Sequence, residues 1–347
     1  MLRSLCGLWG VLVTAVAGSV SAGVVTDGTV GPRVHRGGDF EIGADLGRRA
    51  GRNLFHSFER FSLDAGERAT FSGPDDIRNV ISRVTGGARS DIDGTIASTI
   101  PGADFYFLNP AGVMFGPNAS LDVQGSFHVS TADELRFADG ARFSAIDPAA
   151  SSFTVAAPEA FGSWARGGPR SASIAGDSSC PQARLCRWSE AMLRSAVALW
   201  RCPGAHCPVE LGRAGRSGAW RAAQSGAGAV RGAITMTDEA QVNADGQSGG
   251  GSIAISGGRV LIRDFSFVDA RGSEIGADGG EISIVADEVT VDGSIVGTSA
   301  VFVGGNAGAT TIAAGRLDLV NGSVISSGGG GGGDIALAAG SCSGWVT

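Results

Sequence analysis

The chain has 347 residues, of which 57 are glycine, and its 27 Lys and Arg face 34 Asp and Glu. This balance excludes the basic footprint of a nucleic-acid-binding protein, and the glycines lack the three-residue period of collagen. A single Tyr and four His leave little material for acid–base catalysis, so we expect no enzyme, no metal and no cofactor. The composition suits an extended β-repeat fold with many tight turns.

The first 22 residues have the features of a signal peptide. Arg3 supplies a positive start, residues 8–17 form an apolar run too short to span a membrane, and residues 19–22 are small. We therefore expect cleavage near Ala22 and a mature chain that passes through the periplasm to the cell surface or the medium. A buried N-terminal strand is the alternative.

From Val24 to about Phe161, short apolar runs alternate with polar residues and stop at Gly, Asn or Asp. This pattern predicts closely spaced strands, and it is clearest at residues 79–131. We expect a helical turn at residues 75–78 and an end to the region at Ala157-Pro158. Because a solenoid exposes unpaired backbone at its ends, we also expect an N-terminal cap, over residues 24–75.

Residues 233–340 contain an internal repeat. Four copies of one strand open at glycines that are 29, 28 and 25 residues apart: Gly251, Gly280, Gly308 and Gly333. In the first three copies a second strand starts nine residues after the glycine, and a third apolar pair follows. Each copy is thus one three-stranded rung, and rungs must stack to bury their apolar sides. The fourth copy has only begun at Thr347.

The predicted fold is therefore all-β: a right-handed parallel β-helix, or solenoid, with an N-terminal β cap. A β-sandwich with long hairpins is the alternative. The fixed offsets between strands in successive copies favour the β-helix.

Residues 177–224 break the pattern around them. They contain three tryptophans, a predicted helix at residues 190–200, and four of the six cysteines: Cys180, Cys186, Cys202 and Cys207. These cysteines could bind zinc with His206, although their spacings are poor for it, or they could form two disulfides.

A frame error in the gene is the interpretation that we favour for this segment. Codons compatible with residues 183–192, read two nucleotides later, permit Glu-Thr-Leu-Ser-Val-Val-Gly-Gly-Asp, which is solenoid sequence. Translated as written, the segment would force a loop out of the solenoid or misfold the later rungs.

Several motifs stand in close order within residues 79–131. They are Asn79–Gly87 (NVISRVTGG), Ile92–Ile96 (IDGTI), Phe107–Gly112 (FLNPAG) and Phe115–Val123 (FGPNASLDV), extended by Ser126–Asp133 (SFHVSTAD). This block resembles the N-terminal secretion (TPS) domain of the filamentous haemagglutinin family, the exported partners of two-partner secretion systems. The resemblance covers residues 24–165 well, and residues 233–340 only as generic solenoid. The family pattern has Asn-Pro-Asn-Gly where this chain has Ala111, so the turn depends on Pro110 and Gly112.

The resemblance implies a secreted, adhesin-like exoprotein. Its N-terminal domain would be recognised in the periplasm by the POTRA domains of an outer-membrane β-barrel transporter, and the unfolded chain would pass through the barrel and fold outside. The recognition residues that it implies are Asn79, Arg83, Asn109, Pro110, Gly112 and Asn118. Each has a structural alternative: asparagines stack at β-helix turns, and Gly and Pro shape turns. Arg83 is the stronger functional candidate, although it could pair with Asp91 or Asp93 on the surface.

Two other functions compete with export. A β-helix enzyme that degrades polysaccharides needs clustered carboxylates, whereas the acidic residues of the repeats lie mostly beside turns: Asp264, Asp287, Glu288, Asp292 and Asp318. A cell-surface adhesin or structural protein that binds host or surface glycans overlaps with the favoured function. We expect four regions: the signal peptide (1–22), the secretion domain (23–165), the anomalous segment (166–232) and truncated β-helix repeats (233–347).

Overall fold

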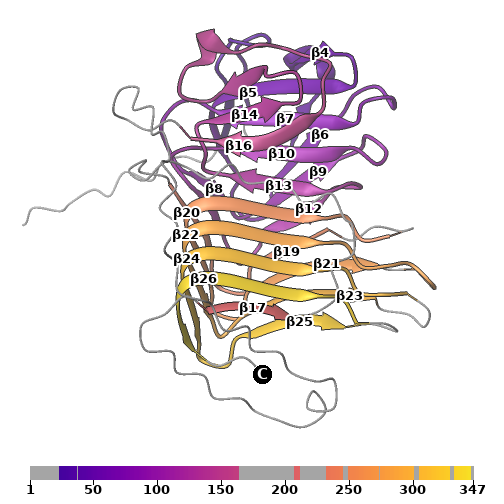
Figure 1. The fold of residues 1–347 in the computed structure, drawn as a ribbon. Coiled ribbons are helices and arrows are strands. Elements are labelled where there is room, and N and C mark those ends of the chain that lie inside the picture. The colour runs from indigo at the N-terminus through magenta and orange to yellow at the C-terminus, as the bar shows by residue number, and fades with distance from the viewer. Residues whose placement is uncertain are drawn as a thin grey trace, which may run out of the picture.

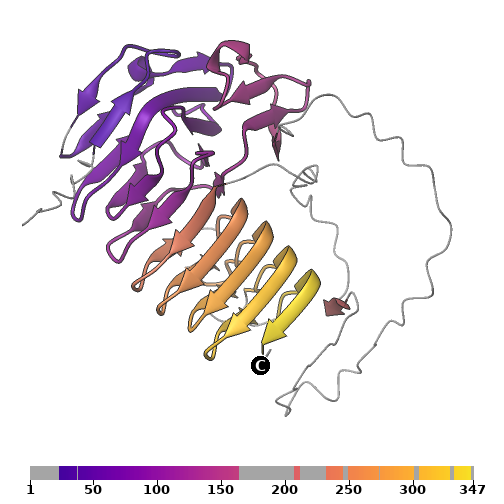
Figure 2. The same cartoon turned by 90° about the vertical axis from the view of Figure 1, so that its left-hand side faces the viewer.

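The computed structural model describes residues 23–36, 38–163, 207–211, 232–244, 249–272, 274–300, 305–328 and 332–344. These residues coil into a parallel β-helix of about eight turns, whose strands stack from the indigo N-terminal end to the yellow C-terminal end (Figures 1 and 2). Within these ranges there is no α-helix, and no helix is long and apolar enough to cross a membrane. The prediction of an all-β solenoid is confirmed.

One ladder of parallel strands runs the length of the solenoid. Its members are β5 (Asn53–Ser62), β7 (Asn79–Val84), β10 (Asp104–Leu108), β13 (Phe127–Ser130), β20 (Ile253–Arg263), β22 (Ile282–Asp292), β24 (Thr310–Val320) and β26 (Ile335–Gly344). Each strand pairs in parallel with the next one in this order. Each turn of the coil therefore adds one strand to the ladder.

Shorter strands line the remaining sides of each turn. The second side is formed by β8 (Ser90–Ile92), β11 (Val113–Phe115) and β18 (Ala233–Met236), which pair in parallel in this order. β18 also pairs with the second half of β20, a strand of the first ladder described above. The third side is formed by β3 (Phe40–Ile42), β6 (Arg68–Phe71), β9 (Thr95–Ser98) and β12 (Ser120–Asp122), followed by β19 (Gln241–Asn243), β21 (Phe267–Gly272), β23 (Ile295–Ala300) and β25 (Val324–Gly328).

The C-terminal repeats differ from the prediction in two ways. The expected strands at residues 251–255 and 260–262 form a single strand, β20, because its pairing with β22 extends through Gly257, skips Gly258 and resumes at Arg259. The fourth copy is also more complete than expected. β26 extends to Gly344, and Cys342 lies in register with Leu317 of the rung before it.

Antiparallel strands cover the N-terminal end of the coil. β1 (Gly23–Thr26) and β4 (Arg48–Ala50) both pair antiparallel with β5, β2 (His35–Arg36) pairs antiparallel with β1, and a short 3₁₀ turn, η1 (Ala44–Leu46), lies between them in sequence. The predicted cap of residues 24–75 is too long, because β5 and β6 already stack in parallel on β7 and β9. The expected helical turn at residues 75–78 is a hydrogen-bonded turn outside any helix, with Ile77 N 3.1 Å from Pro74 O.

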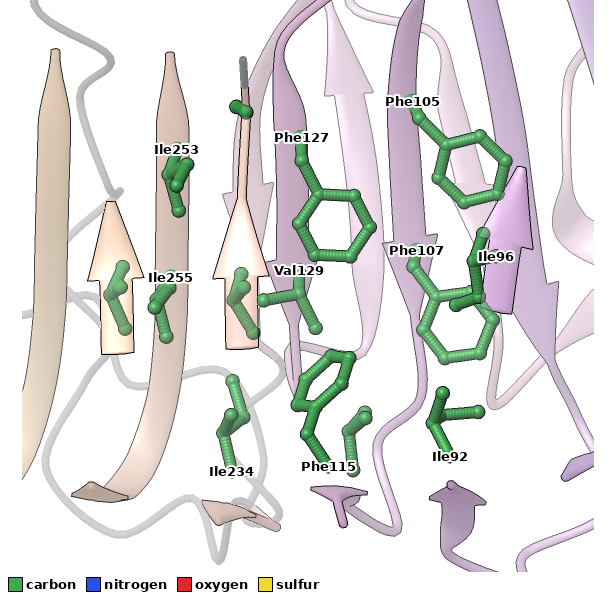
Figure 3. Packing of buried hydrophobic residues seen from close by; sticks show 14 of the residues in the cluster. Ile92, Ile96, Phe105, Phe107, Phe115, Phe127, Val129, Ile234, Ile253 and Ile255 are labelled. Atoms are coloured by element: carbon green, nitrogen blue, oxygen red, sulfur yellow. The ribbon is translucent and has the colours of Figure 1, made fainter. Parts of the chain in front are cut away.

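The interior of the coil is a continuous column of apolar side chains. Alternate residues of each strand point inward, so that Phe105 and Phe107 of β10 stack beside Phe127 and Val129 of β13 (Figure 3). The column continues across the junction to Ile253 and Ile255 of β20. Burial of each large apolar side chain contributes about 1.5–3 kcal/mol to folding, and only stacked rungs can provide it.

A small antiparallel sheet lies outside the coil. It consists of β14 (Glu134–Phe137), β15 (Arg142–Ser144) and β16 (Pro158–Gly162), with η2 (Pro148–Ala150) in sequence between β15 and β16. We call it the outer sheet. In Figure 1, β14 and β16 of this sheet lie over the ladder strands β5, β7 and β10. Its side chains Leu135, Phe137 and Phe143 form a second apolar cluster with outward residues of the first ladder, among them Phe55 and Tyr106. The expected end at Ala157-Pro158 is wrong, because Pro158 begins β16.

The ladder passes directly from β13 to β20, although 122 residues separate Ser130 from Ile253 in the sequence. The later rungs therefore continue the coil, in agreement with a loop out of the solenoid rather than misfolded rungs. Of the anomalous segment only β17 (Cys207–Leu211) is described, paired antiparallel with β26. The signal peptide, the helix predicted at 190–200, and Cys180, Cys186 and Cys202 lie outside the described residues, and the frame-error interpretation stays a prediction.

Candidate functional site

Asn79 begins β7 and belongs to a column of polar side chains along the ladder. Its Nδ2 donates a hydrogen bond to Asn53 Oδ1 at 2.7 Å, and Asn53 in turn donates to the carbonyls of Thr154 and Ala156. Asp104 follows in register on β10. Burial raises the pKa of Asp104, which accepts hydrogen bonds from Ser126. Asn79 thus holds successive rungs together, as the structural alternative for this residue predicted.

Arg83 is fully buried between the first ladder and the outer sheet. Its guanidinium donates to Ser57 Oγ at 2.7 Å, to Thr29 Oγ1 at 2.9 Å, and to Ser144 O and Ser151 Oγ at 2.5 Å each. The guanidinium carbon also lies 4.1 Å from the centre of the Phe143 ring. One side chain therefore connects the cap, the ladder and the outer sheet.

Asp27 balances the charge of Arg83 through two bridging hydroxyls. Ser57 and Thr29, which accept from Arg83, donate to Asp27 Oδ2 at 2.6 Å and to Oδ1 at 2.8 Å. Burial raises the pKa of Asp27, but the hydrogen bonds from Ser57, Thr29 and Thr85 outweigh this effect and lower it overall. Burial lowers the pKa of Arg83 to about 10, and the charge of Asp27 opposes that shift. The arginine stays charged at neutral pH.

The predicted surface pairing of Arg83 is wrong. Asp91 instead pairs with Arg89 at 2.7 Å, and Asp93 binds Asn118. The reason is the alternation along β7: Val80, Ser82 and Val84 face the interior, which turns Arg83 outward beneath the outer sheet.

The Asn-Pro-Ala-Gly turn at residues 109–112 joins β10 to β11. Asn109 is buried; its Oδ1 accepts from the Ala111 N–H at 3.0 Å, and its Nδ2 donates to Ala88 O at 3.0 Å and to Ser90 Oγ at 2.9 Å. The Gly112 N–H closes the turn on Asn109 O at 3.0 Å. Neither Pro110 nor Ala111 has a positive φ, as in a type I turn, so Ala111 fits where the family pattern has Asn.

The same turn contacts the start of the C-terminal rungs, at Gly232 and Ala233. Pro110 O accepts from the Gly232 N–H at 3.2 Å. Gly112 has a φ of +120°, and a Cβ at this position would lie 2.8 Å from Ala233 O, so the close approach requires glycine. Pro110 and Gly112 therefore seat the first strand of the C-terminal rungs, and the exposed Ala111 marks the outside of the turn.

Asn118 is exposed in the turn between β11 and β12. Its backbone N–H donates to Asp93 Oδ1 at 2.8 Å, and its Nδ2 donates to Asp93 Oδ2 at 3.1 Å, one rung away. The same arrangement recurs in the C-terminal rungs, where the backbone N–H and Nδ2 of Asn306 donate to Asp278 Oδ1 at 2.7 and 3.3 Å. Asn118 is therefore a turn-stacking residue whose side chain is also available to a partner.

The six predicted residues do not form one cluster. Arg83 lies in register with Leu108, next to the Asn109 turn, whereas Asn79 lies at the other end of β7 and Asn118 lies beyond β11. Sequence reasoning missed Asp27, Thr29, Ser57, Ser144 and Ser151, the partners of Arg83. No local signal could have found them, because Ser144 and Ser151 stand 61 and 68 residues away from Arg83 in the chain. Among the described residues no group of three His, Cys, Asp or Glu could hold a metal ion.

Comparison with protein families agrees with the motifs. Residues 22–170 match the family described as the TPS secretion domain, which confirms the recognition of that domain in this part of the chain. No curated protein shows significant similarity to the chain.

Among solved structures, the chain is similar to the HMW1 secretion domain from Haemophilus influenzae, with 14% sequence identity. The alignment covers 89% of this chain and 73% of that one, with a TM-score of 0.29. At this TM-score the superposition carries no argument, so the assignment depends on the family match and the motifs.

Proposed function

We propose that this chain, a two-partner-secretion exoprotein by its TPS secretion domain at residues 22–170, is exported when POTRA domains of an outer-membrane transporter bind that domain. The observation that carries the proposal is the family match over the same residues that form the cap, the first four rungs of the ladder and the outer sheet. After cleavage near Ala22, the chain would cross the periplasm and reach the cell surface or the medium.

The construction of the coil supports export as an unfolded chain. Within each half, every ladder strand pairs with the strand of the turn just before it, so a rung can form as soon as it leaves a pore. Residues 23–179 contain no cysteine, which removes cross-links that would obstruct a narrow barrel.

Burial divides the predicted recognition residues into two groups. Arg83 and Asn109 are buried and satisfied by this chain's own groups, so we assign them to folding of the domain. Asn118 and the half-buried Pro110 lie at turns that face solvent, as does Ala111 next to Pro110, and we assign the transporter contact to these turns. Adhesion and glycan binding stay predictions of the sequence.

The test is binding of the purified mature chain to isolated POTRA domains of the partner transporter. Asn118→Ala is expected to weaken binding while the chain stays folded, because it removes an exposed amide. Asn306→Ala is the matched control, since the backbone N–H and Nδ2 of Asn306 both donate to Asp278 in a distal rung, as those of Asn118 do to Asp93. Equal binding by both variants and the unmodified chain would assign the contact elsewhere, and no binding by the unmodified chain would refute the proposal.

A further inference from the structure

A pocket of about 460 Å³ opens beside the cap, and one of its lining residues, Ala88, also accepts a hydrogen bond from Asn109 of the turn described above. Its lining comes from β1, β2, β5 and the loop after β7: Val25, Arg33, His35, Glu59, Arg60, Gly86 and Ala88. We call it the cap pocket. Its volume lies within the range of about 300–1,000 Å³ that small-molecule sites occupy.

A β-bulge builds this pocket. Val25 pairs with Arg60 and Thr26 pairs with Phe58, so Glu59 is an extra residue in β5. A bulge changes the direction of side chains, and here it places the neighbouring residues Glu59 and Arg60 on the same pocket. Val25 also pairs with His35 on its other side, so Arg60, Val25 and His35 form one row across the three strands.

The loop after β7 closes the pocket over the bulge. The Thr85 N–H donates to Phe58 O at 2.8 Å, which fixes the loop to β5. A Cβ on Gly86 would lie 2.1 Å from Glu59 O, so only glycine allows this approach. Gly86 belongs to the Asn79–Gly87 motif, which thus contributes directly to the wall of the pocket.

The two arginines of the pocket differ in their ion pairing. Arg33 forms an ion pair with Glu59 at the rim. Arg60 forms no ion pair within the described ranges, and its Nε is shielded from solvent without a hydrogen-bond acceptor. A guanidinium without an ion-pair partner prefers a planar, two-oxygen anion. Two arginines and one glutamate give the pocket a net positive charge.

We propose that the cap pocket binds a carboxylate-bearing ligand, whose carboxylate pairs with Arg60 while the body of the ligand lies on Val25. His35 and Arg33 stand at the opening as further donors. The carboxylate could belong to a free acidic sugar or to an acidic side chain of a protein, and both present the same group to Arg60. The residues that line this site do not include Pro110, Ala111 or Asn118, the turn residues assigned to the transporter.

Calorimetric titration of the purified mature chain tests the proposal with three probes: glucuronate, the neutral glucose, and the tripeptide Glu-Val-Glu. Glucuronate binding identifies an acidic sugar as sufficient, tripeptide binding identifies a protein carboxylate as sufficient, and either result supports the site when glucose does not bind. Absence of binding by both acidic probes at ~10 mM would overturn the proposal.

Variants separate Arg60 from general charge. Arg60→Gln is expected to weaken binding about tenfold or more, Arg60→Lys less, and Glu59→Gln is expected to strengthen it because the competing carboxylate is removed. Arg49→Gln removes the same charge from an exposed arginine outside the pocket, paired with Asp76, and should leave binding unchanged. An equal loss in Arg49→Gln and Arg60→Gln would contradict a built site, and thermal unfolding of each variant verifies the fold.

Discussion

At the scale of single residues, the most important polar side chain of the domain, Arg83, is buried. Arg83 is the largest of the fully buried side chains. Its guanidinium donates to three hydroxyls and to the Ser144 carbonyl, and Asp27 lies behind two of those hydroxyls. A buried cation is tolerable when its donors are satisfied, and removal of one partner then costs far more than a surface ion pair would. We therefore expect Arg83 to stabilise the fold by joining the cap, the ladder and the outer sheet.

Replacement of Arg83 by Met is expected to lower the free energy of unfolding by about 3 kcal/mol. The variant fills a similar volume but leaves Ser144 O and Asp27 without the guanidinium. Urea unfolding of the mature chain measures the effect, and Arg89→Met, which breaks the exposed pair with Asp91, should change stability by about 0.5 kcal/mol or less. Equal effects of the two variants would show that Arg83 is not the connection described.

The interior also contains a histidine. His56 of β5 is fully buried beside Phe58 and Phe71, and burial lowers its pKa to about 4, against smaller opposing effects of the Leu46 carbonyl and Asp45. His128 packs outside the coil on Tyr106, with ring centroids 4.4 Å apart, and burial lowers its pKa to about 3. Both residues fold as neutral imidazoles.

Stability is therefore expected to fall in acid. Below pH 6.5 the unfolded chain binds a proton at His56 that the folded chain excludes, so stability decreases as pH falls from about 6.5 to about 4 and then levels off for this residue. The loss is about 1.4 kcal/mol per pH unit in that window, or about 3 kcal/mol in total.

Urea unfolding at several pH values between 7 and 4 measures this dependence. His56→Phe removes the titrating group and should flatten the slope, while His128 still contributes in both proteins. A slope that is the same in the variant and in the unmodified chain would exclude His56 as its source.

At the scale of elements, the sequence predicted the features that depend on local sequence pattern. Alternation and turn residues predicted the strands, and the repeat of opening glycines predicted the stacking of the C-terminal rungs in register. It did not predict the outer sheet, because β14 and β16 pair antiparallel outside the coil and carry the same alternation as ladder strands. Nor did it predict that β20 would continue through Gly257, because a glycine can lie either in a turn that ends a strand or at a bend within a strand.

The outer sheet is expected to be a separately opening unit held by Phe143. This residue is fully buried and packs on Phe55, with ring centroids 5.1 Å apart, and on the Arg83 guanidinium. Phe143→Ala should cost about 3–5 kcal/mol locally. Hydrogen exchange should then become faster in β14–β16 while β22 and β24 stay protected.

Uniform loss of protection along the whole ladder would instead show that the outer sheet and the coil unfold as one unit. The matched control is Phe265→Ala, which removes a ring that is 69% exposed at a corner of the C-terminal rungs and should leave β14–β16 unchanged.

At the scale of the whole molecule, the chain is one continuous coil that begins in a cap and a secretion domain. The junction of β13 with β20 shows that the ladder tolerates a long excursion between two rungs, because each rung needs only the one beneath it. The sequence predicted this dependence on stacking, and it predicted export only through the motifs of residues 79–133. Strand periodicity and turn residues alone predict a solenoid and no more, because binding of a partner at the turns would leave no mark on strand periodicity.

Secretion from cells that express the full chain, with and without its partner transporter, tests the central claim most directly. The mature chain is expected to accumulate in the medium or on the surface only when the transporter is present, and to stay in the periplasm when it is absent. Equal amounts outside the cell in both strains would contradict recognition of the TPS secretion domain as the route of export.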